Sequence, residues 1–248
     1  FNTDDVRSEP DLVSILEMLG DQARALLILP LVSGGSLNAL VFVQLMGETR
    51  FGINELEVAR TITNQASIAL ENARLYQSSV RMADRFAVLN ETSSLVSASL
   101  NPEEVYVSVH HAAERLMPLD SFVITLFDET ANEVDAVYLY DRGKRLPGEK
   151  VPFGKGMSSK VISSGKPFLI VDATKDTATD YVQAGDEADT TKSILAVPMI
   201  LGGKALGMLS AQSYQTGVYS EEDVQLLGTL ANQAIVAIQN GRLFNETQ

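Results

Sequence analysis

An internal repeat limits the possible folds of this chain more than any other feature of its sequence. When the chain is shifted by 168 residues, residues 27–44 align with 195–212 and residues 61–76 align with 229–244, both without a gap. A chance match between two similar amphipathic helices would not also align a proline and a Gly-Gly pair. We therefore infer that one domain type occurs twice. The identical positions of the first copy are Leu27, Pro30, Gly34, Gly35, Gln44, Thr61, Asn64, Gln65, Ala66, Ala69, Asn72, Arg74 and Leu75.

The two copies differ in completeness. Residues 86–194 precede the shared part in the second copy, whereas only residues 1–26 precede it in the first. We therefore predict an incomplete copy in residues 1–53, a long connecting helix over residues 54–100 and a complete copy in residues 84–248. Because the first residue is Phe1 rather than Met, we expect the chain to be a fragment of a longer protein.

Composition excludes several classes of function. The sequence has no cysteine, which rules out disulfides, thiolate metal sites, cysteine nucleophiles and a thioether-linked bilin. The net charge of −13 repels a phosphate backbone, so we expect no nucleic-acid partner. The longest apolar runs, 25–32 and 194–201, are far shorter than the roughly 20 residues of a membrane span, so we expect a cytoplasmic protein without one.

The complete copy predicts an α+β fold. Asn101 followed by Pro102 and two acidic residues is typical of a helix start, and this helix should reach about Met117. Ser220 and Asp223 form a capping box for a final helix. Between them we expect a short helix over 157–164, and six strands in a mostly antiparallel sheet, at 121–127, 133–140, 150–153, 167–172, 193–201 and 204–213.

This order of elements resembles the GAF domain family. The resemblance rests on two strands joined by Gly202-Gly203 in residues 194–212 and on the helix sequence of residues 219–243, and both features recur in the first copy. It covers about residues 84–248 in full and about residues 11–76 as the C-terminal half of a second GAF domain. It implies a sensory or regulatory role in signal transduction, and a parallel dimer as in other tandem GAF proteins.

A long helix is predicted between the two copies, because residues 53–101 contain neither glycine nor proline. It should run from near Glu55 to near Ser99. Small and apolar residues follow each other at spacings of four and three, as in a coiled-coil seam, which predicts a bundle shared by two chains. Alternatively, the two ends pack on their own sheets and the middle frays. The seam consists of Ile62, Ala66, Ala69, Ala73, Tyr76, Val80, Ala83 and Ala87.

Candidate catalytic and metal-binding groups are few. His110 and His111 are adjacent on the predicted helix and point about 100° apart, so we expect no joint chelation and no metal site. No nucleophile is matched to either histidine, and we expect a module that is not an enzyme.

The acidic residues of 172–190 fit no calcium loop and indicate a solvated loop. Gly154-Lys155-Gly156 forms either a tight turn or a cradle for an anion.

The resemblance also implies a ligand pocket. In ligand-binding GAF domains the backbone at the start of the short helix meets a phosphate, and strand residues meet a base. Carried over to this sequence, Tyr140 would stack a base, Asp141 would accept a base N–H, and Thr191 and Ser210 would hydrogen-bond a ring edge. The full set implied in this way is Val123, Tyr140, Asp141, Met157, Ser158, Tyr181, Thr191 and Ser210.

These observations predict a GAF sensory module of a sensor kinase or cyclase type, with the output domain outside this chain. It would bind a small ligand of unknown identity and signal through the dimeric bundle. Two alternatives remain at this stage. One is a structural spacer that only dimerises, and the other is a haem or iron sensor that uses His110 or His111.

Overall fold

The computed structural model describes residues 2–3, 23–46, 50–175 and 191–246. The chain divides into two compact units, Phe1–Met82 and Ala83–Gln248. In the described residues, no helix combines the length and the apolar character that a membrane span requires.

The described part of the first unit holds a three-stranded antiparallel sheet in the order β1-β2-β3. Its strands are β1 (Asn2–Thr3), β2 (Ala23–Ser33) and β3 (Ser36–Met46). Gly34 and Gly35 join β2 to β3 and have φ angles of 56° and 80°. Both values lie in the left-handed region, as a two-residue hairpin turn between twisted strands requires.

The repeat seen in the sequence extends to backbone register. In the first unit Pro30 lies opposite Leu40, and in the second unit Pro198 lies opposite Met208, at a shift of 168 residues in both strands. The first hairpin has a register irregularity between Ala23 and Ala25. In addition, each hairpin has one near its turn, between Leu31 and Val32 in β2 and between Ala205 and Gly207 in β10. These two irregularities fall at matching places in the two hairpins.

One helix, α2 (Ile53–Ala98), runs from the first unit into the second, as the absence of glycine and proline predicted. Its first part belongs to the first unit, where Glu71 accepts a hydrogen bond from the Ser33 hydroxyl at 2.7 Å. Its last part belongs to the second unit, where Val88 and Val96 are buried in the core. Residues 72–84, between these parts, are all exposed in this single chain.

The second unit is built on an antiparallel sheet, and its described residues form seven strands in the order β6-β5-β4-β10-β9-β8, with β7 also paired to β5. The strands are β4 (Ser121–Asp128), β5 (Glu133–Asp141), β6 (Lys144–Leu146), β7 (Lys150–Pro152), β8 (Phe168–Ile170), β9 (Ser193–Leu201) and β10 (Lys204–Ser213). The six predicted strands are present. The seventh, β6, follows a turn at Arg142 and Gly143, whose φ angles are 48° and 76°.

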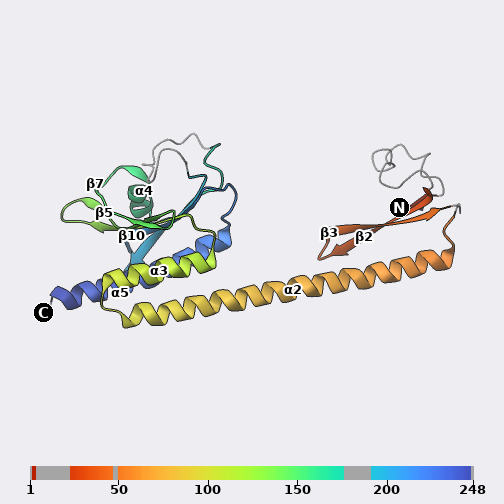
Figure 1. Ribbon diagram of the computed structural model, residues 1–248, viewed down its shortest axis with the longest axis horizontal. Coiled ribbons are helices and arrows are strands. Elements are labelled where there is room, and N and C mark those ends of the chain that lie inside the picture. Colours follow the sequence, from red (N-terminus) through yellow and green to blue (C-terminus); the bar gives the residue numbers. More distant parts are fainter. Residues whose placement is uncertain (1, 4–22, 47–49, 176–190, 247–248) are drawn as a thin grey trace. The chain divides into compact units, whose positions relative to one another are not determined.

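Helices cover both faces of this sheet (Figure 1). On one face lie α3 (Pro102–Leu116) and α5 (Glu221–Glu246), and on the other lies the short α4 (Gly156–Ser164). The larger core cluster fills the space between the sheet, α3 and α5, and includes Phe122, Leu195, Leu209, Leu230 and Ile235. A smaller cluster lies under α4 and includes Val161, Ile162 and Met208.

The predicted helix ends are confirmed at the level of single hydrogen bonds. Asn101 caps α3 by accepting a hydrogen bond from the Glu103 amide at 3.1 Å. At the start of α5 the Asp223 carboxylate accepts hydrogen bonds from the Ser220 amide at 2.8 Å and hydroxyl at 2.7 Å. Gly165 ends α4 with a φ of 61° in the left-handed region.

We predict that Gly207→Ala destabilises the second unit, because a Cβ at this position of β10 would lie 2.3 Å from the Thr125 carbonyl oxygen. The backbone of β4 is held on both sides by neighbouring strands and has no room to retreat. The free energy of unfolding, measured by urea denaturation, should fall by roughly 1–3 kcal/mol.

The matched control is Gly228→Ala in α5, where a Cβ meets no atom within 4 Å. This substitution should raise the free energy of unfolding by up to about 1 kcal/mol, because alanine favours the helix over glycine. Equal stabilities of the two variants would contradict the described pairing of β10 with β4.

Candidate functional site

A cavity of about 290 Å³ lies on the α4 side of the sheet in the second unit. Ligand pockets in proteins usually measure about 300–1,000 Å³, so this cavity lies just below the lower end of their range. Residues of β4, β5, β7 and β10 line it together with the start of α4. The lining consists of Val123, Thr125, Val134, Ala136, Leu139, Pro147, Glu149, Val151, Lys155, Gly156, Met157, Ser158, Met208 and Gln212.

Strand alternation decides which side chains reach the cavity. In β4, Val123 and Thr125 face it, whereas the residues between and beside them face the helices. In β10, Met208 lies opposite Thr125 and Gln212 continues the same face. The floor of the cavity is therefore set by the pairing of two central strands.

Thr125 contributes a polar side chain to the floor of the cavity. The residue is 3% exposed, and its hydroxyl oxygen is buried without a hydrogen-bond partner. Most buried polar side-chain atoms in proteins have a partner, and an unsatisfied one costs about 1–3 kcal/mol. A hydroxyl in this state, on the floor of a cavity, is a candidate partner for a bound molecule.

A short chain of polar side chains lies beside this floor. The Thr191 hydroxyl donates to Gln212 Oε1 at 3.1 Å, and Gln212 Nε2 donates to the Ser210 hydroxyl at 3.3 Å. Gln212 belongs to the lining, so it connects Thr191 and Ser210 to the cavity. Both were singled out by the resemblance, whereas Gln212 was not.

The start of α4 forms another wall. Gly154 and Gly156 have φ angles of 108° and 75°, and the Gly154 amide donates to the Ser159 hydroxyl at 3.0 Å. Lys155 is the N-cap residue, and no side chain caps this helix end. The structure therefore shows the tight turn that was expected of the Gly-Lys-Gly sequence, directly before a helix start without a side-chain cap.

The residues singled out from the sequence are distributed over several places. Val123, Met157 and Ser158 line the cavity. Tyr181 lies outside the described residues. The acidic loop is described only up to Lys175, whose ammonium group lies 2.8 Å from the Asp172 carboxylate.

Tyr140 and Asp141 do not line the cavity. The Tyr140 ring packs on the helix side of the sheet, with its centroid 4.1 Å from that of His110. Asp141 is buried and accepts a hydrogen bond from the Tyr214 hydroxyl at 2.7 Å. Tyr140 is therefore not placed to stack on a base in this cavity, and Asp141 is not placed to accept a hydrogen bond from one.

A bulge in β5 explains the place of Tyr140. Thr125 lies opposite Ala136 and Ile124 lies opposite Tyr138, which leaves Val137 without a partner in the register. Because of this extra residue, the later side chains of β5 point to the opposite faces from those that regular alternation would give. Leu139 therefore reaches the cavity and Tyr140 does not. Regular alternation from Val134 onward would have placed Tyr140 on the cavity side.

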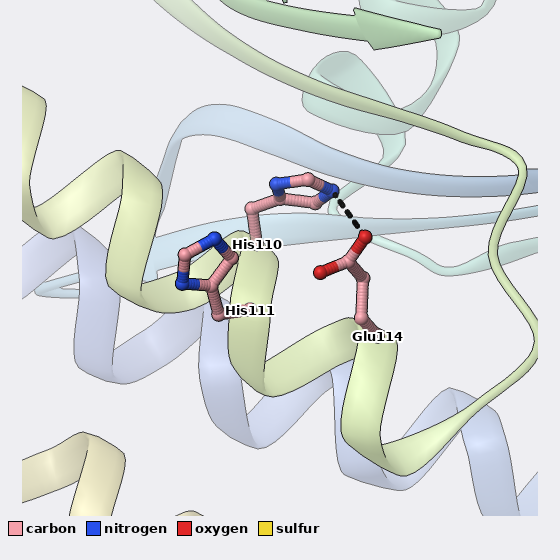
Figure 2. Close-up of side chains that lie close together, drawn as sticks. All are labelled: His110, His111 and Glu114. Carbon is pink, nitrogen blue, oxygen red and sulfur yellow. Dashed lines mark ion pairs between the residues drawn. The ribbon is translucent and has the colours of Figure 1, made fainter. Parts of the chain in front are cut away.

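A second group of polar residues lies on α3, away from the cavity. His110 is buried against Phe122, Tyr138 and Tyr140, whereas His111 and Glu114 are exposed. The Tyr138 hydroxyl and His110 Nδ1 form a hydrogen bond of 3.0 Å. Burial lowers the pKa of His110 below its usual value, so the imidazole is neutral near pH 7. Figure 2 shows its ring directed toward the Glu114 carboxylate.

A model of the GAF domain matches residues 99–239, more than half of the chain. The chain therefore belongs to the GAF domain family, as the resemblance indicated. No curated protein matches the chain in sequence.

Solved structures share the fold at low sequence identity. One is the GAF domain of a phosphoenolpyruvate-protein phosphotransferase from Coxiella burnetii, with 21% identity and a TM-score of 0.56, which covers 66% of this chain and 98% of that one. Another is residues 122 to 287 of a methyl-accepting chemotaxis protein, with 20% identity and a TM-score of 0.52, which covers 62% and 98%.

A third similar structure is an enzyme. It is the free methionine-R-sulfoxide reductase of Neisseria meningitidis in complex with its substrate, with 19% identity and a TM-score of 0.55, covering 64% of this chain and 91% of that one. The prediction that the chain is not an enzyme was therefore wrong. The histidines offered no catalytic arrangement in the sequence, but a similar fold serves catalysis in that protein.

We predict that Thr125→Val stabilises the ligand-free protein, from which any bound small molecule has been removed. Valine has nearly the same shape and removes a hydroxyl that has no partner, so the free energy of unfolding should rise by about 1 kcal/mol. Thr92→Val is the matched control, because the buried Thr92 hydroxyl donates to the Val88 carbonyl at 2.8 Å. The control should not be stabilised; a stabilisation equal to that of Thr125→Val would contradict the unpartnered state of Thr125.

Proposed function

We propose that this chain is a cytoplasmic sensory module of a signal-transduction protein, and that its second unit binds a small ligand in the cavity beside α4. The observation that carries the proposal is the buried, unpartnered Thr125 hydroxyl on the cavity floor. Apolar side chains such as those of Leu139 and Met208 line the same cavity. An apolar pocket with a few directed polar groups is typical of a small-molecule site.

The charges at the rim favour a small polar ligand with an anionic group. Lys155 and the amino end of α4 attract negative charge to one wall. Glu149 lines the cavity as well and would repel a second anionic group or accept a donor. A compact metabolite with an anionic end and at least one hydrogen-bond donor suits this arrangement.

The similar structures support a role in signalling. They include domains of a phosphotransferase and of a methyl-accepting chemotaxis protein. A sensor kinase, as in two-component systems, or a cyclase is the kind of output we propose for a domain outside this chain. Ligand binding would favour one of two arrangements of the helices that connect to it.

We also propose that two chains form a parallel dimer along α2. Large apolar side chains on this helix are exposed in the single chain, including Ile62 and Tyr76, which are 61% and 72% exposed. A long helix with an apolar stripe gains stability by burying that stripe against another helix. The alanines of the predicted seam would let two helices approach closely.

The matching register of the two hairpins supports a further part of the proposal. We propose that residues 1–53 are the C-terminal part of a first GAF domain and that residues 84–248 are a complete second one. The helices α2 and α5 begin at Ile53 and Glu221, again at a shift of 168 residues. The proposed tandem would join two domains of one type by a connecting helix.

The ligand proposal is tested by thermal-shift screening of cyclic nucleotides, nucleobases and small organic anions. A ligand at a hundredfold excess over its Kd should raise the Tm by roughly 5–10 °C. The variant Ala136→Leu fills the cavity and should lose this shift, whereas Thr125→Val should reduce it. A ligand that shifts the wild type and Ala136→Leu equally, or no shift with any compound, would contradict the proposal and favour a spacer.

The dimer proposal is tested by Ala73→Glu, which places like charges opposite each other in the proposed seam. Sedimentation velocity should show a dimer for the wild type and a larger monomer fraction for this variant. Ser78→Glu is the matched control, because Ser78 is also exposed but lies opposite the seam on the helix. Identical sedimentation of all three proteins would count against the seam.

A further inference from the structure

A group of three side chains on α3 has the composition of a metal site. One ligand atom from each of His110, His111 and Glu114 lies within 4.8 Å of the others. Figure 2 shows that all three come from one stretch of the helix. This group lies on the helix side of the sheet and takes no part in the cavity described above.

Helix geometry places Glu114 between the two histidines. At about 100° per residue, Glu114 lies about 40° around the helix from His110 and about 60° from His111, one turn further along. The spacings of four and three residues are those at which helical side chains meet. The sequence argument against a metal site considered only the adjacent histidines and not this shared carboxylate.

The second observation is the state of His110. Its side chain is 2% exposed, and its Nε2 atom is buried without a hydrogen-bond partner. Nε2 lies 3.5 Å from Glu114 Oε1. In a tetrahedral zinc site with bonds of about 2.0–2.2 Å, neighbouring ligand atoms are separated by about 3.4 Å. The His110–Glu114 pair already has this separation.

Tyr138 supplies the support that a metal-bound histidine needs. Metal-binding histidines usually donate the N–H of the other ring nitrogen to a neighbouring oxygen, which fixes the ring and its tautomer. Here Nδ1 lies 3.0 Å from the Tyr138 hydroxyl. When Nδ1 donates to that oxygen, the lone pair of Nε2 faces the Glu114 carboxylate, and a cation between the two satisfies both.

We propose that His110 Nε2, the Glu114 carboxylate and His111 bind one divalent transition-metal cation, for which Zn²⁺ is the best match. Imidazole nitrogen with a carboxylate oxygen is a common zinc ligand set, and water completes the fourth position. His111 turns about its side-chain torsions to reach the ion, as its exposed position permits. The positive charge of the nearby Arg145 is offset by Glu103, 3.4 Å away.

The test is Zn²⁺ binding to the tag-free chain by isothermal titration calorimetry. One ion should bind per chain, and Glu114→Gln and His111→Gln should each weaken binding at least about tenfold. Glu104→Gln is the matched control, because it removes the same charge from an exposed position on the same helix. It should bind Zn²⁺ as the wild type does.

A second measurement reports on His110 itself, because a substitution of this buried residue would disturb the core. In nitrogen-detected NMR spectra, Zn²⁺ should shift the His110 Nε2 resonance while Nδ1 stays protonated. An unmoved Nε2 resonance, no 1:1 binding, or equal affinity of wild type and Glu114→Gln would overturn the proposal. Equal affinity of wild type and His111→Gln would overturn the three-ligand set. Neither measurement depends on the cavity.

Discussion

The pairing of β4 with β10 at the centre of the sheet is the constraint on which the rest of the second unit depends. Because successive residues of a strand point to opposite faces, this pairing sends Phe122 and Leu209 into the helix-covered core. It sends Thr125 and Met208 to the α4 side, where the cavity lies. One register therefore fixes both the hydrophobic core and the floor of the candidate ligand site.

Much of this architecture could be predicted from local chemistry. Helix starts can be predicted from the sequence, because a side chain such as Asn101 or Asp223 forms hydrogen bonds with backbone groups only a few residues away. The Gly202-Gly203 turn is readable because both residues need positive φ angles. The repeat then carried the same interpretation to the first hairpin, whose register matches that of the second.

The site was harder to predict because it depends on contacts distant in the sequence. The unpaired Val137 changes which face of β5 each later residue occupies, and nothing local in the sequence marks that bulge. The short strand β6 follows an Arg-Gly turn rather than one of the more common hairpin sequences. Gln212 and Thr125 look like ordinary strand residues until their neighbours across the sheet are known.

The group formed by His110, His111 and Glu114 was also difficult to predict, because its arrangement depends on tertiary packing. Sequence spacing placed His110 and His111 on one helix, but only packing against Tyr138 and Tyr140 shows that His110 is buried and oriented. The two faces of the sheet thus hold two different candidate sites. Tyr138 and Leu139 are consecutive residues of β5, and the first contacts the histidine while the second lines the cavity.

The central claim is that the cavity beside α4 holds a small molecule. Native mass spectrometry of the protein, purified without denaturation, tests it most directly when wild type and the cavity-filling variant Ala136→Leu are compared. The account predicts an additional small mass on the wild type that is absent from the variant and is released on denaturation. Equal masses for the two proteins, after allowance for the substitution, would contradict it.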